Sequence, residues 1–252
     1  MVKKALLPKS ALELFPEYNP NNLKFARDIT DRVEKIRKKY ESKIAFRLKE
    51  KNYFGVPRIN NHPRYADVIK NINESTRFLD AGYGCGWDLR RVIKDGLRIE
   101  NAKGIDIEPL LRKINFEVYR DEETMGKVFE IGDALSTRFE SNHFDIVHSG
   151  SVMHILGKRD KIIKYLQEVY RVIKKPNGIF FGRTLGNDSE KEIVVIGDPV
   201  VKTERNIYVS TPEKLKELLT NLGFKEIDIE VEKLVKEHPL IPSYMLHFFA
   251  KT

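Results

Sequence analysis

Three glycines at alternate positions form the part of the sequence best suited to chemistry. Gly82, Gly84 and Gly86 follow an apolar run at 78–81 and precede a helical pattern that begins at Trp87. Glycine lets the chain turn tightly and leaves no Cβ between the backbone and a ligand, while the following helix directs free N–H groups into the same space. The arrangement predicts contact with a nucleotide-like molecule.

The neighbouring residues indicate which kind of nucleotide. A dinucleotide-binding G-x-G-x-x-G motif needs glycine at 87 or 89, where this chain has Trp87 and Leu89. Asp80 ends the apolar run, and a carboxylate there suits a cationic ligand better than a pyrophosphate. A dehydrogenase is therefore only a minor alternative.

Further acids follow two predicted strands. Asp106 ends one strand, and its carboxylate can accept hydrogen bonds from both hydroxyls of a ribose. Asp133 and Ala134 follow the next strand. Ligands of parallel sheets bind where strands end, although a single acid at such a position is more often a helix cap. The joint occurrence of these acids with Asp80 and the three glycines favours a ligand site.

Hydrophobic periodicity predicts the elements that must position these residues. Strands are expected at 77–81, 103–107, 127–131, 144–148, 179–183, 225–231 and 245–249. Helices are expected at 23–50, 64–72, 87–94, 109–120, 158–175 and from Ser210 to Gly223. Strands that alternate with helices imply an α/β fold, with a mainly parallel sheet covered on both faces.

Composition narrows the class of protein. The 252 residues are 41% apolar, which is ordinary for a globular chain, and no apolar run is long enough to span a bilayer. The N-terminal apolar stretch is too short for a secretory signal, so a cytoplasmic location is expected. Cys85 is the one cysteine, which excludes an intramolecular disulfide and a cysteine metal cluster.

The positive charge is concentrated at the N-terminus. Residues 1–76 contain 17 Lys/Arg and 9 Asp/Glu, whereas residues 77–252 contain 28 of each. Such an imbalance could mark contact with nucleic acid or another anionic partner. The alternative is the solvated face of an amphipathic helix, because apolar residues recur at helical spacing between the charges.

Asp80 and the three glycines resemble the first motif of class I S-adenosylmethionine-dependent methyltransferases, and the resemblance covers about 77–184. Within that range, several runs are similar to the fungal polyketide and meroterpenoid methyltransferases. They are residues 78–90, 104–109, 144–149 and 181–186. The resemblance implies a doubly wound, Rossmann-like sheet of seven strands whose last strand is antiparallel. Residues 77–252 would form this catalytic domain and residues 1–76 a basic helical extension.

The same resemblance implies a cofactor, S-adenosyl-L-methionine, with S-adenosyl-L-homocysteine as the product. In the family, an acid at the position of Asp133 receives the adenine amino group. The predicted cofactor-binding residues are Asp80, Gly82, Gly84, Gly86, Asp106, Ile107, Asp133, Ala134 and Ser149.

Methyl transfer makes modest demands on a protein. The sulfonium is an activated electrophile, so the site must align donor and acceptor and remove a proton where the acceptor carries one. No metal is required. His148 and His154 are candidate bases, with His154 preferred, and Arg183 could hold an anionic acceptor. The sequence His148-Ser149-Gly150-Ser151 lacks the Asn/Asp-Pro-Pro-Tyr/Phe motif, which argues against adenine-N6 and glutamine methylation.

These features favour a small-molecule acceptor methylated on oxygen, either a hydroxyl or a carboxylate. The alternatives are methylation of RNA or protein, docked through the basic N-terminal region, and a non-catalytic S-adenosylmethionine-binding module. Residues 52–63, which include Tyr53, Phe54, Arg58 and His62, could close over the cofactor. The connection 185–208 is either a lid or a surface loop.

Overall fold

A seven-stranded sheet forms the centre of the molecule. The computed structural model describes residues 5–43, 54–187, 191–195, 206–234 and 244–252. In space the strands follow the order β3-β2-β1-β4-β5-β9-β8. Their bounds are β1 Phe78–Ala81, β2 Ala102–Asp106, β3 Phe129–Ile131, β4 Ile146–Gly150, β5 Ile179–Gly186, β8 Lys225–Lys233 and β9 Tyr244–Lys251.

The strand directions confirm the predicted architecture. Neighbouring strands from β3 to β5 are all parallel, whereas β9 is antiparallel to both of its neighbours, β5 and β8. β8 therefore runs in the same direction as β5, and β9, the last strand, is reversed. The carboxyl ends of β1 to β5 consequently meet at one edge of the sheet, where the predicted site residues lie.

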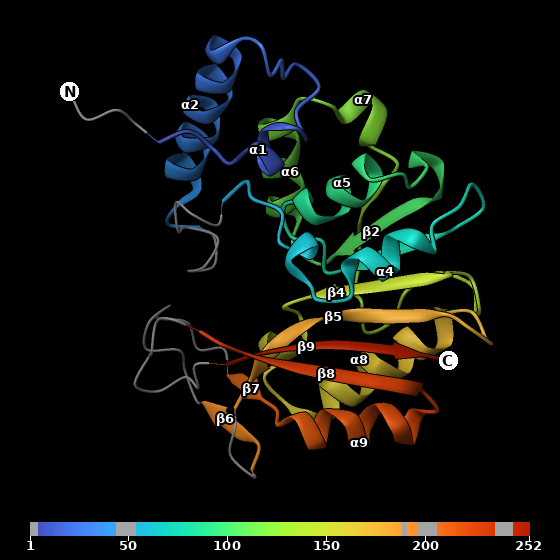
Figure 1. Ribbon diagram of the computed structural model, residues 1–252. Helices are drawn as coiled ribbons and strands as arrows, with labels where there is room; N and C mark the ends of the chain where they lie inside the picture. Colours follow the sequence, from blue (N-terminus) through green and yellow to red (C-terminus); the bar gives the residue numbers. More distant parts are fainter. Residues whose placement is uncertain (1–4, 44–53, 188–190, 196–205, 235–243) are drawn as a thin grey trace.

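Helices cover both faces of the sheet (Figure 1). Val147 and Phe180 belong to a core shared with α8 and α9, whereas Ile146 and Phe181, one residue away on the same strands, pack with α4 and α5. This alternation follows from the two-residue period of a strand. The helices are α4 Tyr65–Lys70, α5 Trp87–Lys94, α6 Pro109–Tyr119, α7 Glu122–Met125, α8 Arg159–Val172 and α9 Pro212–Leu222. None of the helices in the described ranges has the length and apolar character that crossing a membrane demands.

The N-terminal region packs beside α6. Helix α2, Leu23–Tyr40, is capped by the side chain of Asn22 and buries its apolar stripe in a cluster that includes α6 residues. It ends before the predicted limit at 50, and residues 44–53, with Tyr53, lie outside the described ranges. The short helix α1, Lys9–Leu12, precedes α2 and buries Ala11 and Leu12.

The connection after β5 contains a small two-stranded sheet. Strands β6 Ile193–Val195 and β7 Ile207–Val209 pair in antiparallel fashion. Val209 packs with Leu185 and Met245, so part of this connection is anchored to the end of the main sheet. Residues 188–190 and 196–205 are outside the described ranges. A lid role for the connection therefore stays a prediction.

A buried ion pair joins α5 to the segment after α6. Arg90 Nη2 lies 2.7 Å from Asp121 Oδ1, and the two side chains are 4% and 8% exposed. Arg90 Nη1 also donates to the carbonyl of Gly86 at 3.2 Å. The pair therefore supports the turn that follows β1.

We predict that Asp121→Asn lowers the free energy of unfolding by about 3 kcal/mol, because it leaves a buried guanidinium without its counter-ion. Urea denaturation measures the loss. Glu117→Gln is the matched control, since it weakens a more exposed pair with Lys39 and should cost less than about 1 kcal/mol. Equal losses in the two variants would contradict the prediction.

Candidate active site

The glycine loop connects β1 to α5 at the carboxyl edge of the sheet. Gly82, Gly84 and Gly86 have φ of 91°, 58° and 75°, a conformation that side chains rarely adopt. A Cβ on Gly82 would stand 2.2 Å from a methyl of Val152, and one on Gly86 would stand 2.7 Å from the Phe129 ring. A Cβ on Gly84 would meet nothing within 4 Å. The backbone of Gly84 therefore faces open space, as the close approach of a ligand requires.

Asp106 holds this loop from the end of β2. Its Oδ2 accepts a hydrogen bond from the Gly84 N–H at 2.9 Å, and its Oδ1 accepts one from the Glu108 N–H at 3.0 Å. Burial raises the pKa of the Asp106 carboxyl, and the two backbone hydrogen bonds offset only part of that effect. The Gly132 N–H donates to the Asp106 carbonyl at 2.9 Å, which brings the end of β3 alongside.

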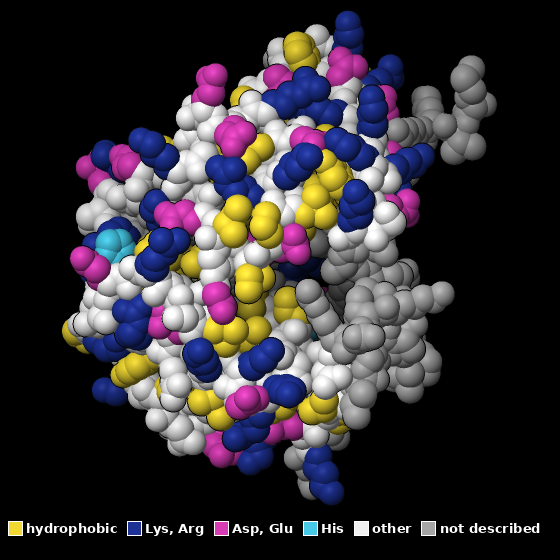
Figure 2. Space-filling view, turned by 180° about the vertical axis from the view of Figure 1, so that it is seen from behind, with side chains coloured by type: hydrophobic (Ala, Val, Ile, Leu, Met, Phe, Trp, Pro, Cys, Tyr) yellow, Lys and Arg dark blue, Asp and Glu magenta, His cyan; other side chains and the backbone are white. Residues whose placement is uncertain are grey.

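The residues after β2 and β3 combine polar and apolar groups. Asp133 is exposed, and its Oδ1 accepts from the Leu135 N–H at 2.9 Å, while Ala134 packs against the core. Ile107 and Ile131, each at the end of its strand, are 67% and 48% exposed. Acceptor oxygens beside exposed apolar side chains suit a purine, which has polar edges and apolar faces. On the face shown in Figure 2, apolar side chains gather toward the middle of the surface, between charged ones.

Asp80 lies below the loop and contacts a histidine of the next strand. Its Oδ1 is 2.8 Å from His148 Nδ1, and both side chains are almost completely buried. Its Oδ2 is buried and has no hydrogen-bond partner among the described residues. Burial raises the pKa of the Asp80 carboxyl, although His148 acts in the opposite direction. Because a carboxylate can only accept, the pairing directs the Nδ1 hydrogen of His148 to Asp80 and leaves Nε2 as the acceptor.

A second carboxylate, the half-buried Asp88, was not identified from the sequence. Its Oδ1 accepts from the backbone N–H groups of Arg58 and Ile59, at 2.6 and 3.0 Å. Burial disfavours the ionised form, but Arg183, His148 and Arg58 outweigh that effect and hold the Asp88 pKa below its ordinary value. In the sequence, Asp88 is an ordinary acid in the first turn of a helix, and no local signal indicates that residues 58–59 cover it.

His148 and Asp88 converge on Gly150 at the end of β4. A Cβ on Gly150 would stand 3.5 Å from both His148 Nε2 and Asp88 Oδ2. The acceptor nitrogen of His148 is therefore directed toward the carboxyl edge of β4.

Two other predicted site residues have different surroundings. Ser149 is fully buried on the opposite face, where its Oγ accepts from the Tyr165 hydroxyl at 2.7 Å. His154 is buried in the 3₁₀ helix η3, Met153–Leu156, and its Nδ1 lies 3.4 Å from the Leu185 nitrogen. That N–H donates to Nδ1, so the ring hydrogen of a neutral His154 is on Nε2.

Arg183 lines a cavity of about 450 Å³ that lies between residues 58–63 and strands β5, β8 and β9. Arg58, His247 and Glu232 also line it. The segment 58–63 is fixed by His62, whose Nε2 donates to the Phe248 carbonyl at 3.1 Å. Burial lowers the pKa of His62 to about 3, so this histidine is a neutral structural residue.

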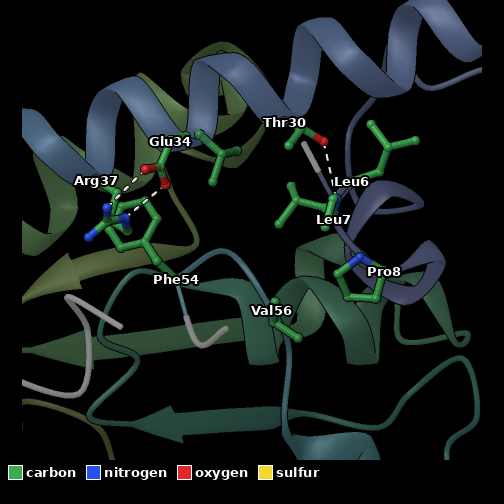
Figure 3. A pocket seen from close by; sticks show the side chains of 10 residues that line it. Leu6, Leu7, Pro8, Thr30, Glu34, Arg37, Phe54 and Val56 are labelled. Atoms are coloured by element: carbon green, nitrogen blue, oxygen red, sulfur yellow. Dashed lines mark hydrogen bonds and ion pairs between the residues drawn. The ribbon is translucent and has the colours of Figure 1, made fainter. Parts of the chain in front are cut away.

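A smaller cavity of about 290 Å³ lies beside α2 (Figure 3). Leu6, Thr30 and Phe54 line it, and the ion pair between Glu34 and Arg37 lies at its side. None of the predicted site residues lines this cavity, which separates it from the carboxyl edge of the sheet.

Comparisons with known proteins agree with this geometry. Residues 79–182 match a family model described as a methyltransferase domain. O-methyltransferase phiE from a fungal species is 28% identical over 133 residues, which cover 50% of this chain and 44% of that protein. Asnovolin E/chermesin D methyltransferase nvfJ from Aspergillus novofumigatus is 23% identical, with 63% of this chain and 59% of that protein covered. The aligned part thus spans about half the length of these relatives.

Solved structures are similar in fold at low identity. The 1,6-didemethyltoxoflavin-N1-methyltransferase of Burkholderia thailandensis, with bound S-adenosylhomocysteine, has a TM-score of 0.56 and 19% identity and covers 74% of this chain and 75% of its own. Phosphoethanolamine N-methyltransferase 2 of Haemonchus contortus, in complex with S-adenosyl-L-methionine, has a TM-score of 0.60 and 17% identity and covers 90% of this chain and 59% of its own.

Three observations indicate that the cofactor is S-adenosyl-L-methionine. They are the strand order, the glycine loop held by Asp106 and the match to a methyltransferase domain. Together, the matched domain at residues 79–182, the similar methyltransferases and the similar fold support a class I S-adenosylmethionine-dependent methyltransferase.

Proposed function

We propose that this protein transfers a methyl group from S-adenosyl-L-methionine to an oxygen of a small molecule, either a hydroxyl or a carboxylate. The main observation behind the proposal is the hydrogen bond from the Gly84 N–H to the Asp106 carboxylate. It fixes a glycine backbone that faces open space beside an acid. The name of phiE, an O-methyltransferase, supports oxygen as the acceptor.

The residues at the edge of the sheet fit the cofactor. When bound, S-adenosyl-L-methionine supplies an activated methyl group. Asp106 would accept hydrogen bonds from the ribose hydroxyls, and Asp133 would accept one from the adenine amino group. Ile107 would pack on the adenine, and the backbone at Gly84 would lie against the methionine part. Asp80 would act through its electrostatic field and through His148, because its own side chain is buried.

His148 is the better candidate base for an acceptor that carries a proton. Asp80 holds the hydrogen of His148 on Nδ1 and leaves Nε2 as an acceptor near Gly150. His154, which the sequence favoured, instead receives the Leu185 N–H on Nδ1 and has a hydrogen on Nε2. A carboxylate acceptor would need neither histidine.

We further infer that residues 1–76 form a cap and residues 77–252 the catalytic domain. Phe54 packs on Trp87 with ring centroids 5.4 Å apart, so the N-terminal region reaches the glycine loop. Several basic side chains of α2 are ion-paired, Arg32 with Glu17, Arg37 with Glu34 and Lys39 with Glu117. This pairing supports a small acceptor over an RNA or protein that docks on free positive charge. The cytoplasmic location stays a prediction.

Asp106→Asn should weaken binding of S-adenosylhomocysteine by about 1–3 kcal/mol, because hydrogen bonds to a charged acceptor are lost. Titration calorimetry measures the affinity. Glu130→Gln is the control and should bind normally, because Glu130 is an exposed residue of neighbouring β3 that pairs with Lys103. Unchanged affinity in Asp106→Asn would reject its role.

Asp106→Asn also shows whether the Asp106 carboxylate contributes to the stability of the fold as well as to cofactor binding. Because burial raises the Asp106 pKa, the folded protein binds this proton more tightly than the unfolded chain does. Stability therefore falls as the pH rises from the ordinary carboxyl range through the folded pKa. Near neutral pH, cofactor-free Asp106→Asn should lose less than about 1 kcal/mol of stability in urea, because removal of the buried charge offsets the loss of one of the two backbone hydrogen bonds. A larger loss would show that the carboxylate is structural.

With a hydroxyl acceptor, His148→Asn should lower kcat by at least about 100-fold, because a positioned base is lost. His154→Asn should lower it by less than about tenfold. Steady-state kinetics at saturating donor and acceptor measure kcat for both variants. A larger defect in His154→Asn would reverse the assignment.

The acceptor class is tested by incubating the protein with isotopically labelled S-adenosyl-L-methionine and separate small-molecule, RNA and protein fractions of the source cells. Label should enter the small-molecule fraction, as an ester or an ether. Label found only in RNA or protein would overturn the proposal. Binding of the donor without label in any fraction would indicate a non-catalytic module.

A further inference from the structure

A charged row crosses the sheet inside the larger cavity. Arg183 of β5 is paired in register with His247 of β9, and His247 is paired with Glu230 of β8. Residues paired in this way point to the same face, and all three line the cavity of about 450 Å³. Since neighbouring strands are about 4.8 Å apart, the backbones of Arg183 and Glu230 are roughly 10 Å apart.

The basic end of the row adjoins the candidate active site. Arg183 is paired with Gly150 of β4, the residue toward which His148 Nε2 is directed. Arg58 also lines the cavity, and both arginines act on the half-buried Asp88 carboxylate. Two guanidinium groups therefore lie on the side of the cavity nearest β4.

The other end of the row is acidic. Glu230 and Glu232 point to the same face of β8, two residues apart, and both line the cavity. Glu230 forms no ion pair with any residue that the structure describes. Asp228, the next residue on that face, is already paired with Arg64 at 3.3 Å. The wall formed by β8 therefore presents two carboxylates to the cavity.

His247 lies between the two ends and has an unsatisfied nitrogen. Its Nε2 donates to Glu232 Oε2 at 2.8 Å, which fixes that carboxylate. The side chain is 6% exposed, and its Nδ1 has no hydrogen-bond partner among the described residues. A buried polar atom without a partner is costly, and it indicates a place where a bound molecule supplies the missing hydrogen bond.

We propose that this cavity binds the methyl acceptor, and that the acceptor is a small zwitterion whose anionic group faces Arg183 and whose ammonium group faces Glu230 and Glu232. Opposite charges at the two ends favour a molecule that carries both over molecules that carry only one, because a singly charged molecule interacts favourably with one end alone. The inference rests on the proposed function, since it takes the end of β4 as the place of methyl transfer.

The test measures binding to the protein saturated with S-adenosylhomocysteine. The probes are 5-aminopentanoate, which carries both charges, and its matched halves, pentanoate and pentylamine. Titration followed by NMR gives the three dissociation constants. In the parent protein, 5-aminopentanoate should bind at least about tenfold more tightly than either half, because it satisfies both ends of the row.

Two variants assign the ends of the cavity. Glu230→Gln combined with Glu232→Gln should remove the preference for 5-aminopentanoate over pentanoate, and Arg183→Gln should remove the preference over pentylamine. Glu226→Gln, on the same strand but paired with Lys251, is the control and should keep both preferences. Both cavity glutamates are exposed, so their replacement should leave the fold intact.

The inference is overturned if pentanoate or pentylamine binds the parent as tightly as 5-aminopentanoate does, if 5-aminopentanoate does not bind, or if its preference survives in the double glutamine variant. These outcomes are independent of methyl transfer. Label entering an uncharged or singly charged small molecule would overturn the inference and leave the proposed function standing, whereas absence of transfer would reject the proposed function.

Discussion

The hydrogen bond from the Gly84 N–H to the Asp106 carboxylate is the contact on which the site depends. It fixes the loop after β1 to the end of β2, although the two bonded residues are 22 positions apart in the sequence. Gly82 and Gly86 flank this contact in a conformation that excludes side chains. The acid that would receive the ribose therefore also shapes the loop against which the rest of the cofactor would lie.

Buried charge is the second organising feature, and it is concentrated on one face of the sheet. Asp80 pairs with His148 across β1 and β4, while Asp88 balances Arg58 and Arg183 from α5. Ionised groups out of water are stable only when they are paired, so each of them constrains its neighbours. The arrangement leaves Nε2 of His148 directed toward the end of β4 and puts positive charge beside it.

The N-terminal region contributes to both features. Its backbone at residues 58 and 59 covers Asp88, and Arg58 enters the larger cavity. The same segment is fixed on β9 by the hydrogen bond from His62 to the Phe248 carbonyl. A segment that precedes the sheet in the sequence thus forms one wall of the space in which donor and acceptor would meet.

The sequence by itself determined the sheet, its order of elements and the residues at its carboxyl edge. Period-two apolar runs, helix ends such as Gly223 and the turn glycines act locally, so they could be recognised without neighbours. Only the tertiary structure decided which side chains meet. The pairing of Asp80 with His148, the cover over Asp88 and the row from Arg183 to Glu230 depend on strand register and on packing between distant segments. Register is set by the whole core, because each side chain needs a complementary neighbour, and no local pattern records it.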